Sequence, residues 1–204
     1  DVVPLLTGED PRQIEHLWQK MWWALHYVGR GGIASFAISA VDVALWDLKA
    51  KRAGEPLWRL LGGHDNRVRA YAGGIDLQLP IDKLRDQTEA NLARGFRAIK
   101  MKVGRERLAE DVERVSAMRE LLGPDIPLMV DANMRWSVEQ AIRAAREFVQ
   151  HDVYWLEEPT IPEDFDGHRR VQVEGGLPIA SGENLHTICE FQKLIAAGGA
   201  AFPE

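Results

Sequence analysis

Short apolar runs and helical patterns alternate along this chain from Arg67 onward, and no other feature restricts the fold as strongly. Strand-like runs are expected at residues 68–72, 98–103, 127–130, 153–156, 178–180 and 200–202. Helical patterns lie between them, and one begins at a Ser137-x-x-Gln140 capping box. Alternation of this kind is typical of parallel strands joined by right-handed crossovers. The predicted fold is therefore α/β, a (β/α) TIM-type barrel.

The predicted barrel is incomplete. The strand-like runs account for about five to six β/α units, whereas a closed barrel needs eight strands and typically about 250 residues. We therefore expect the chain to be a piece of a longer protein. The repeat of strand and helix is also compatible with a solenoid. We disfavour a solenoid because the repeated units share no side-chain signature apart from an acid after the strand.

Residues 1–66 have a different pattern from the rest of the chain. Helices are expected at about residues 11–28, 33–52 and 57–61, with glycines separating them. The strand–helix alternation begins only afterwards. We therefore predict two domains, with a helical region at 1–66 and the partial barrel at 67–204.

Bulk composition excludes several classes of protein. The net charge of −6 argues against a nucleic-acid-binding protein, which normally carries a basic stripe. No apolar run approaches the ~20 residues of a membrane span, and no signal-peptide pattern opens the chain. The lone cysteine, Cys189, permits no internal disulfide, so a cytoplasmic location is expected. A nucleophilic role for Cys189 is a weaker alternative.

Three carboxylates, Asp131, Glu157 and Glu183, follow successive strand-like runs at equal intervals, since 157 − 131 = 26 and 183 − 157 = 26. Catalytic groups of parallel barrels lie at the carboxyl ends of the strands, so the three should meet there. Oxygen ligands without His or Cys favour Mg²⁺. Alternatively, such acids cap the following helices. Capping explains Asp131 well but not the Glu157-Glu158 pair, because adjacent acids repel each other unless a cation is near.

Two lysines precede this acidic group by one unit. The period of a strand places Lys100 and Lys102 on one face, with Ile99, Met101 and Val103 on the other. The apolar face should pack against helices, which directs the lysines into the barrel. Two adjacent ammonium groups disfavour each other's charged form, so one lysine is expected to act as a base near neutral pH. Solvated lysines on an edge strand are the alternative.

A lysine base opposite a divalent cation is suited to one class of reaction. The cation can hold a substrate carboxylate and stabilise the charge that grows on it as the α-proton leaves. The predicted chemistry is therefore abstraction of a proton α to a carboxylate, giving an enediolate.

Several segments resemble the signature of the enolase superfamily, in its mandelate racemase and muconate lactonizing enzyme subgroup. Their order and number make the resemblance specific, and it extends over nearly the whole chain. The segments are Lys100-Met101-Lys102, Val130-Asp131-Ala132-Asn133, Trp155-Leu156-Glu157-Glu158-Pro159, Ser181-Gly182-Glu183-Asn184, Phe165-Asp166-Gly167-His168-Arg169-Arg170 and Gly54-Glu55-Pro56-Leu57-Trp58-Arg59-Leu60-Leu61-Gly62-Gly63.

The resemblance implies a role for each matching residue. Lys102 would be the catalytic base, and Lys100 would tune it and contact the substrate carboxylate. Asn133 would also contact the substrate. The Mg²⁺ ligands would be Asp131, Glu157 and Glu183. Residues 1–66 would be the helical part of an α+β capping domain, and an Asp–His pair that opposes the base would lie beyond Glu204.

The resemblance also implies the reaction, most simply the dehydration of a sugar acid (an aldonate or aldarate). A racemase, epimerase or cycloisomerase with the same first step is the alternative, and so is an inactive fragment. The expected partner is a small carboxylate substrate, with no nucleic acid or membrane, in a homo-oligomer. His64, His151 and His168 are expected at the surface or at helix caps. His186 is a weak candidate for lining the site.

Overall fold

The computed structural model describes residues 2–204, which divide into two compact units. The first unit runs to Val68 and includes residues 186–188, and the second contains Arg69–Leu185 and Cys189–Glu204. The expected boundary after residue 66 lies two residues before this division. Whether the two units are separate domains stays a prediction.

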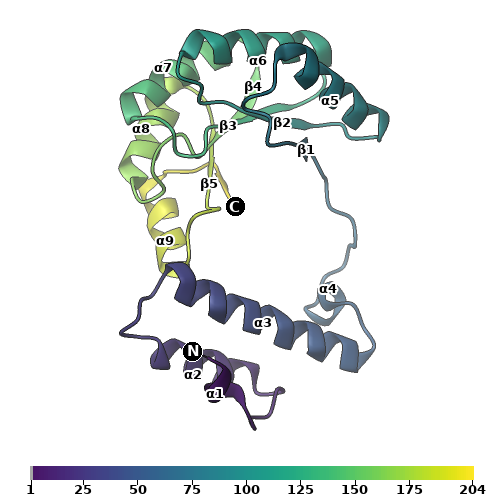
Figure 1. Ribbon diagram of the computed structural model, residues 1–204, viewed down its shortest axis with the longest axis vertical. Coiled ribbons are helices and arrows are strands. Elements are labelled where there is room, and N and C mark those ends of the chain that lie inside the picture. The colour runs from purple at the N-terminus through teal and green to yellow at the C-terminus, as the bar shows by residue number, and fades with distance from the viewer. Residues whose placement is uncertain (1) are drawn as a thin grey trace. The chain divides into compact units, whose positions relative to one another are not determined.

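The second unit contains six parallel strands whose order in the sheet is their order in the chain. Five helices connect successive strands, and they lie along one face of the sheet (Figure 1). The strands are β1 (Ala72–Gly73), β2 (Ile99–Lys102), β3 (Leu128–Asp131), β4 (Val153–Glu157), β5 (Ile179–Ser181) and β6 (Phe202–Pro203); the helices are α5 (Ile81–Ala93), α6 (Leu108–Leu122), α7 (Val138–Val149), α8 (Phe165–Gly175) and α9 (Ile188–Ala197). This arrangement confirms the predicted α/β fold.

The core of this unit lies between the sheet and its helices. Ile99, Met101 and Val103 on β2 and just after it are at most 3% exposed, and they share one cluster with Val115 and Met118 of α6. Burial of each such side chain contributes about 1.5–3 kcal/mol. The apolar face of β2 therefore contacts the helices, as the alternating pattern predicts.

The predicted capping box begins α7. The Gln140 backbone N–H donates to the Ser137 hydroxyl at 3.3 Å, and the Ser137 N–H donates to the Gln140 side-chain oxygen at 2.9 Å. Two donors at the start of the helix are satisfied by this exchange. The capping box was correctly identified from four residues of sequence.

The first strand is shorter than expected and begins at Ala72 instead of residue 68. Strand β1 pairs with β2 only through Ala72 and Gly73. The segment that would pair with residues 68–71 is the turn after α5, where Gly95 and Phe96 bond back to the helix carbonyls. Val68 is consequently 91% exposed, because β propensity cannot form a strand without a partner.

The first unit is helical, as expected. It contains α1 (Val3–Leu6), α2 (Ile14–Ala24), α3 (Gly32–Ala53) and α4 (Leu57–Leu60), of which α1 was not anticipated. A small core forms between α2 and α3 from Met21, Leu25, Ala34 and Ile38. Helix α3 ends at Gly54, whose φ of 70° is the left-handed conformation that glycine adopts easily. Within residues 2–204, no helix is both long and apolar enough to cross a membrane.

Candidate active site

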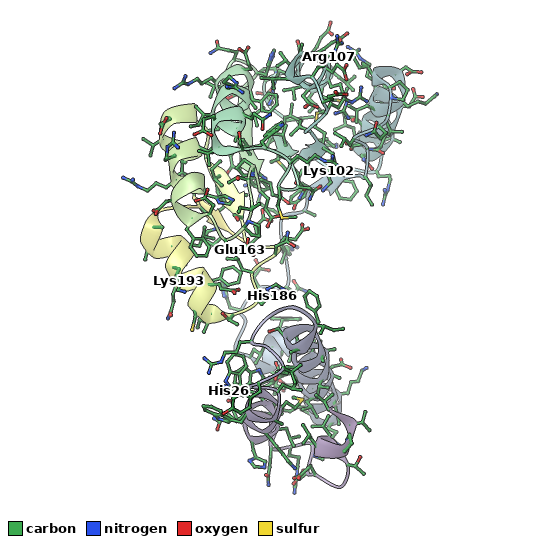
Figure 2. All side chains as sticks on the ribbon, turned by 60° about the vertical axis from the view of Figure 1, so that its left-hand side comes forward. His26, Lys102, Arg107, Glu163, His186 and Lys193 are labelled. Carbon is green, nitrogen blue, oxygen red and sulfur yellow. The ribbon has the colours of Figure 1, made fainter. Side chains whose placement is uncertain are left out.

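The carboxyl ends of β2, β3 and β4 bring three of the predicted residues to one level of the sheet. Lys102 is the register partner of Asp131, and Asp131 is the register partner of Glu157. Neighbouring parallel strands lie about 4.8 Å apart, so these side chains leave the sheet side by side. Figure 2 shows Lys102 on the sheet side of the unit and Arg107, which precedes α6, on the helix side.

Asp131 is fully buried and is held from two directions. The Lys102 ammonium donates to its Oδ2 at 2.6 Å, and the Asn133 backbone N–H donates to its Oδ1 at 2.9 Å. Asn133 reaches this position with a φ of 42°, in the left-handed region that asparagine tolerates. The chain therefore turns at Asn133, which does not continue the alternation of β3. Its side-chain contact with substrate stays a prediction.

Glu157 is almost completely buried and pairs with the other lysine. The Lys100 ammonium donates to its Oε1 at 2.5 Å, and the Trp155 indole N–H donates to its Oε2 at 3.2 Å. Lys100 also lies 3.5 Å from Asp131 Oδ2. Burial raises the pKa of Glu157, and the hydrogen bond from Lys100 only partly offsets it.

The pKa of Lys100 is shifted in the direction opposite to the one expected. Burial alone lowers the pKa of Lys100, but the hydrogen bond and charge of Glu157, with the charge of Asp131, raise it above its ordinary value. The prediction that the adjacent lysine would lower the pKa was therefore wrong for Lys100. The sequence pattern did not show that each lysine contacts a carboxylate, and for Lys100 these opposite charges favour the charged form. The orientation of both lysines away from the helices is as predicted.

Glu158 points to different partners from Glu157. It is 1% exposed, and it accepts hydrogen bonds from the Asn184 side chain at 2.6 Å and the Asn184 backbone N–H at 3.3 Å. Its φ of 36° turns the chain at the end of β4. The repulsion expected between the two adjacent acids is therefore relieved by Lys100 on one side and Asn184 on the other. Adjacent acids alone do not require a metal ion.

Glu183 joins the group from a loop. It lies two residues after the end of β5, is exposed, and follows Gly182, whose φ is 150°. One carboxylate oxygen from each of Asp131, Glu157 and Glu183 can be chosen so that all three lie within 4.8 Å of one another. The structure thus brings together the three acids that sequence spacing selected.

The donor set fits a hard divalent cation. Three anionic oxygens, two of them from buried side chains, converge from adjacent strand ends. Mg²⁺ prefers such ligands and commonly leaves positions for water or substrate. Each of the two buried carboxylates pairs with a lysine, so this position of the fold brings acidic groups and positive charge together.

Sequence reasoning missed several residues around this group. Glu204 follows β6, its backbone N–H donates to the Ser181 carbonyl at 3.1 Å, and burial raises its pKa. Its position one residue past a strand was the available signal. Asp76 and Arg114 are buried beside Lys102 and are described below. No sequence pattern pointed to Asp76 or Arg114, because neither residue directly follows a strand-like run.

Two minor predictions had different outcomes. His168 was expected at the surface or at a helix cap, but it is fully buried within α8, whose N-cap is Asp164, and its Nδ1 contacts the Asp164 carbonyl at 2.8 Å. Cys189 is exposed on α9, and a nucleophilic role for it stays a prediction.

Two parts of the chain match known protein families. Residues 83–203 match the family described as "Enolase C-terminal domain-like". Residues 1–62 match the family described as "Mandelate racemase / muconate lactonizing enzyme, N-terminal domain". The two matches lie on either side of the division between the compact units, which follows Val68.

Individual relatives agree with these matches. The chain is 59% identical over its full length to 3,6-anhydro-alpha-L-galactonate cycloisomerase of Streptomyces coelicolor, covering 56% of that protein. It is 43% identical to L-talarate/galactarate dehydratase of Salmonella typhimurium over 99% of the chain and 51% of the relative. The chain therefore spans about half the length of these curated relatives.

A solved structure extends the likeness to three dimensions. The crystal structure of a racemase from Streptomyces coelicolor A3(2) with bound magnesium has a TM-score of 0.97 and 59% identity, and it covers 100% of this chain and 61% of the other.

Proposed function

We propose a reaction for this chain from one premise: it belongs to the enolase superfamily, in the mandelate racemase and muconate lactonizing enzyme group. Its second unit is accordingly an incomplete TIM-type barrel. The proposed activity of the protein that contains it is Mg²⁺-dependent removal of the α-proton from a sugar acid. One observation carries the proposal, namely two lysine ammonium groups in contact with a cluster of three carboxylates at adjoining strand ends.

In this proposal Asp131, Glu157 and Glu183 hold the metal ion. When bound, Mg²⁺ supplies positive charge that neutralises these carboxylates, stabilises the negative charge that grows on the substrate carboxylate, and disfavours protonation of nearby lysines. The relatives support this assignment, because the racemase structure from Streptomyces coelicolor contains magnesium.

Lys102 is the proposed base and takes the α-proton of the substrate on its Nζ. Its place at the end of β2 keeps Nζ 2.6 Å from Asp131, so the base and the metal ligands share one edge of the sheet. Lys100 lies on the same strand face and binds the substrate carboxylate as a positive charge. Asn133 contributes a further contact with the substrate.

After the α-proton leaves, the electron pair of the C–H bond can form a double bond to the β-carbon and expel its oxygen. When that oxygen is a free hydroxyl, it takes a proton and leaves as water, and the enol product rearranges to a 2-keto acid. This is a dehydration, and we propose it as the reaction. The 43% identical talarate/galactarate dehydratase supports it.

A cycloisomerisation is the second candidate, and the 59% identical relative favours it. In a 3,6-anhydro sugar acid the β-oxygen belongs to a ring ether. Expelling it opens the ring, the oxygen takes a proton and stays attached, and the 2-keto product has the mass of the substrate. The first proton transfer is the same in both reactions.

The test uses the full-length protein that carries this chain, supplied with Mg²⁺ in D₂O. A panel of aldonic, aldaric and 3,6-anhydro sugar acids is incubated and analysed by mass spectrometry and NMR. We expect a 2-keto product from at least one acid. After allowance for the deuterium that the product takes up from the solvent, loss of one water identifies a dehydratase and unchanged mass a cycloisomerase. Deuterium at Cα without a keto product identifies a racemase or epimerase.

Removal of the metal ion with EDTA provides the control, and readdition of Mg²⁺ should restore the reaction. The proposed function is wrong if no acid in the panel gives either a product or deuterium exchange. A homo-oligomeric state and a cytoplasmic location stay proposals, to be tested by light scattering and by cell fractionation.

A further inference from the structure

The backbone of the proposed base lies beyond the end of its neighbouring strand. Strand β1 ends at Gly73, which pairs with Lys100, so the ladder stops before it reaches Lys102. On the opposite edge, Ile99 and Val103 donate their N–H groups to Pro127 and Asp131. Alternate residues of a central parallel strand bond to opposite neighbours, so the Lys102 peptide groups face the side where β1 has already ended.

Two side chains take the place of the missing strand there. The Lys102 N–H donates to Asp76 Oδ1 at 2.8 Å, and Arg114 Nη1 donates to the Lys102 carbonyl at 2.7 Å. Arg114 Nη2 donates to the Asp76 carbonyl at 2.8 Å. The planar guanidinium thus bridges the end of β2 and the loop after β1, and both polar groups of Lys102 are satisfied.

This arrangement is fully enclosed. The exposed fraction is 0% for Asp76 and 1% for Arg114, and Gln87 donates to Asp76 Oδ2 at 3.1 Å. Arg114 also lies 3.6 Å from Asp111, whose Oδ2 accepts from the N–H groups of Gly104 and Arg105 at 2.9 and 2.8 Å. Asp76 and Arg114 therefore hold the last residue of β2, and Asp111 holds Gly104 and Arg105 just after it.

Such a network is an expensive way to fill a protein interior. Burial raises the pKa of Asp76 and Asp111 and lowers that of Arg114, so each charge is disfavoured by its surroundings. Buried ion pairs often stabilise a fold no better than apolar side chains of similar size. Their advantage here is directional, because hydrogen bonds fix the position and angle of one peptide unit and an apolar contact does not.

We propose that Asp76 and Arg114 are positioning residues for Lys102, holding its main chain so that Nζ meets the α-proton of the substrate. The inference rests on the proposed function, in which Lys102 is the base. Neither side chain needs to touch the substrate. A displacement of about 1 Å in a reacting group is enough to lower a rate by roughly 100-fold.

The experiment compares Asp76→Ala and Arg114→Met with Arg119→Met in the full-length protein. Arg119 is a matched control on α6, since it also donates to main-chain carbonyls, namely those of Gly123, Ile126, His151 and Asp152. These bonds join other segments and leave Lys102 untouched. All three variants lose a guanidinium or carboxylate that bonds the backbone, so they should share a loss of stability.

The readout is the rate of α-proton removal at saturating substrate, followed as exchange in D₂O or as formation of the 2-keto product, together with KM and Mg²⁺ affinity. We expect Asp76→Ala and Arg114→Met to lower the maximal exchange rate about 10- to 100-fold, with KM and Mg²⁺ affinity changed less than about threefold. Arg119→Met should leave the rate within about threefold of the parent protein. Asp76→Asn should recover most of the loss, because its amide oxygen can still accept from the Lys102 N–H.

A second readout does not depend on catalysis. Amide hydrogen exchange of a peptide containing Lys102 should become faster in Asp76→Ala and Arg114→Met but not in Arg119→Met. Arg114→Lys extends the series if Arg114→Met does not fold, since lysine cannot donate to both carbonyls in the same geometry and should still lower the rate.

The inference is overturned if the parent protein removes the α-proton, by exchange or by product formation, while the Asp76 and Arg114 variants match Arg119→Met. It is also overturned if their loss appears only in KM or Mg²⁺ affinity. A parent protein that neither exchanges the α-proton of any sugar acid nor forms a 2-keto product instead removes the proposed function, and Lys102 as a base with it. The two failures are therefore distinguishable.

Discussion

The three carboxylates of the site are held in two different ways. Asp131 and Glu157 end adjacent strands, are buried, and contact lysines at 2.6 and 2.5 Å. Glu183 is exposed and lies on a loop after β5. The strand-held pair is placed by the register of the sheet, whereas the loop-held member depends on local contacts. The three side chains carry the same chemical group, but the sheet positions two of them and a loop positions the third.

The difference indicates where the site is rigid. The ends of β3 and β4 are fixed by backbone ladders and by ion pairs whose loss would leave a buried charge alone. The loop of Glu183 is tied down by Asn184, which bonds to the buried Glu158. We expect substitutions in the strand-held part to affect both folding and chemistry, and those in the loop to affect chiefly metal binding.

The largest expected effect is that of Lys102→Ala in the full-length protein. Loss of a general base should lower α-proton exchange by about 100- to 10,000-fold, while Mg²⁺ binding is retained. Exchange measured by NMR in D₂O and Mg²⁺ titration calorimetry check the two halves of this prediction. Normal exchange in the variant would show that the base is another residue.

A matched pair, Glu157→Gln and Glu183→Gln, tests the comparison directly. Both should weaken Mg²⁺ binding, because each removes an anionic ligand from the proposed set. Only Glu157→Gln should also lower the free energy of unfolding, by about 2 kcal/mol, since Lys100 loses a buried ionic partner. Urea denaturation without Mg²⁺ measures this difference. Equal stabilities would contradict the distinction between strand-held and loop-held ligands.

Asn184→Ala examines the contact that holds the loop. The change removes the side-chain donor 2.6 Å from buried Glu158, which should cost about 1–2 kcal/mol of unfolding free energy. Mg²⁺ affinity should fall less than in Glu183→Gln, because all three carboxylates remain. Asn184→Asp is a useful comparison, since it places two acids together and should be worse. An Asn184→Ala variant with unchanged stability and affinity would show that this bond does not hold Glu183.

The smallest expected effect concerns pH and a residue outside the site. Burial lowers the pKa of His168, so the unfolded chain binds a proton that the folded chain does not as pH falls below about 6.5. Folding stability should therefore decline below that pH, with a slope of at most about 1.4 kcal/mol per pH unit from this group. In His168→Asn this component should be absent. Denaturation at pH 7.5 and 5.5 compares the two proteins, and identical pH dependence would contradict the prediction.

Local patterns in the sequence predicted much of what the structure contains. The alternation in Ile99-Lys100-Met101-Lys102-Val103 placed both lysines on the face opposite the helices, because side chains of a strand alternate by geometry. The Ser137 capping box and the Gly54 helix end are equally local. Parallel order of the strands followed from the strand–helix alternation.

The equal spacing of the three acids is more instructive. It predicted that the three acids lie close together, but it did not show that they lie at different levels along the strands. Glu157 is level with Asp131, but its partner on β5 is Ala180, three residues before Glu183. Equal numbers of residues between acids therefore conceal different divisions among helix, loop and strand, and only the pairing register reveals them.

By itself, the sequence determined the fold class, the face on which the lysines lie and the choice of three acids. Each depends on a pattern along the chain, namely the strand–helix alternation, the period of a strand and the spacing of the acids. Only the tertiary structure decided the remainder. It paired Lys100 with Glu157, separated Glu158 from its neighbour, buried His168, and brought Asp76 and Arg114 to the Lys102 backbone across 26 and 12 residues. The physical reason is that hydrogen bonds and charges act over a few ångströms in space, whatever the separation along the chain.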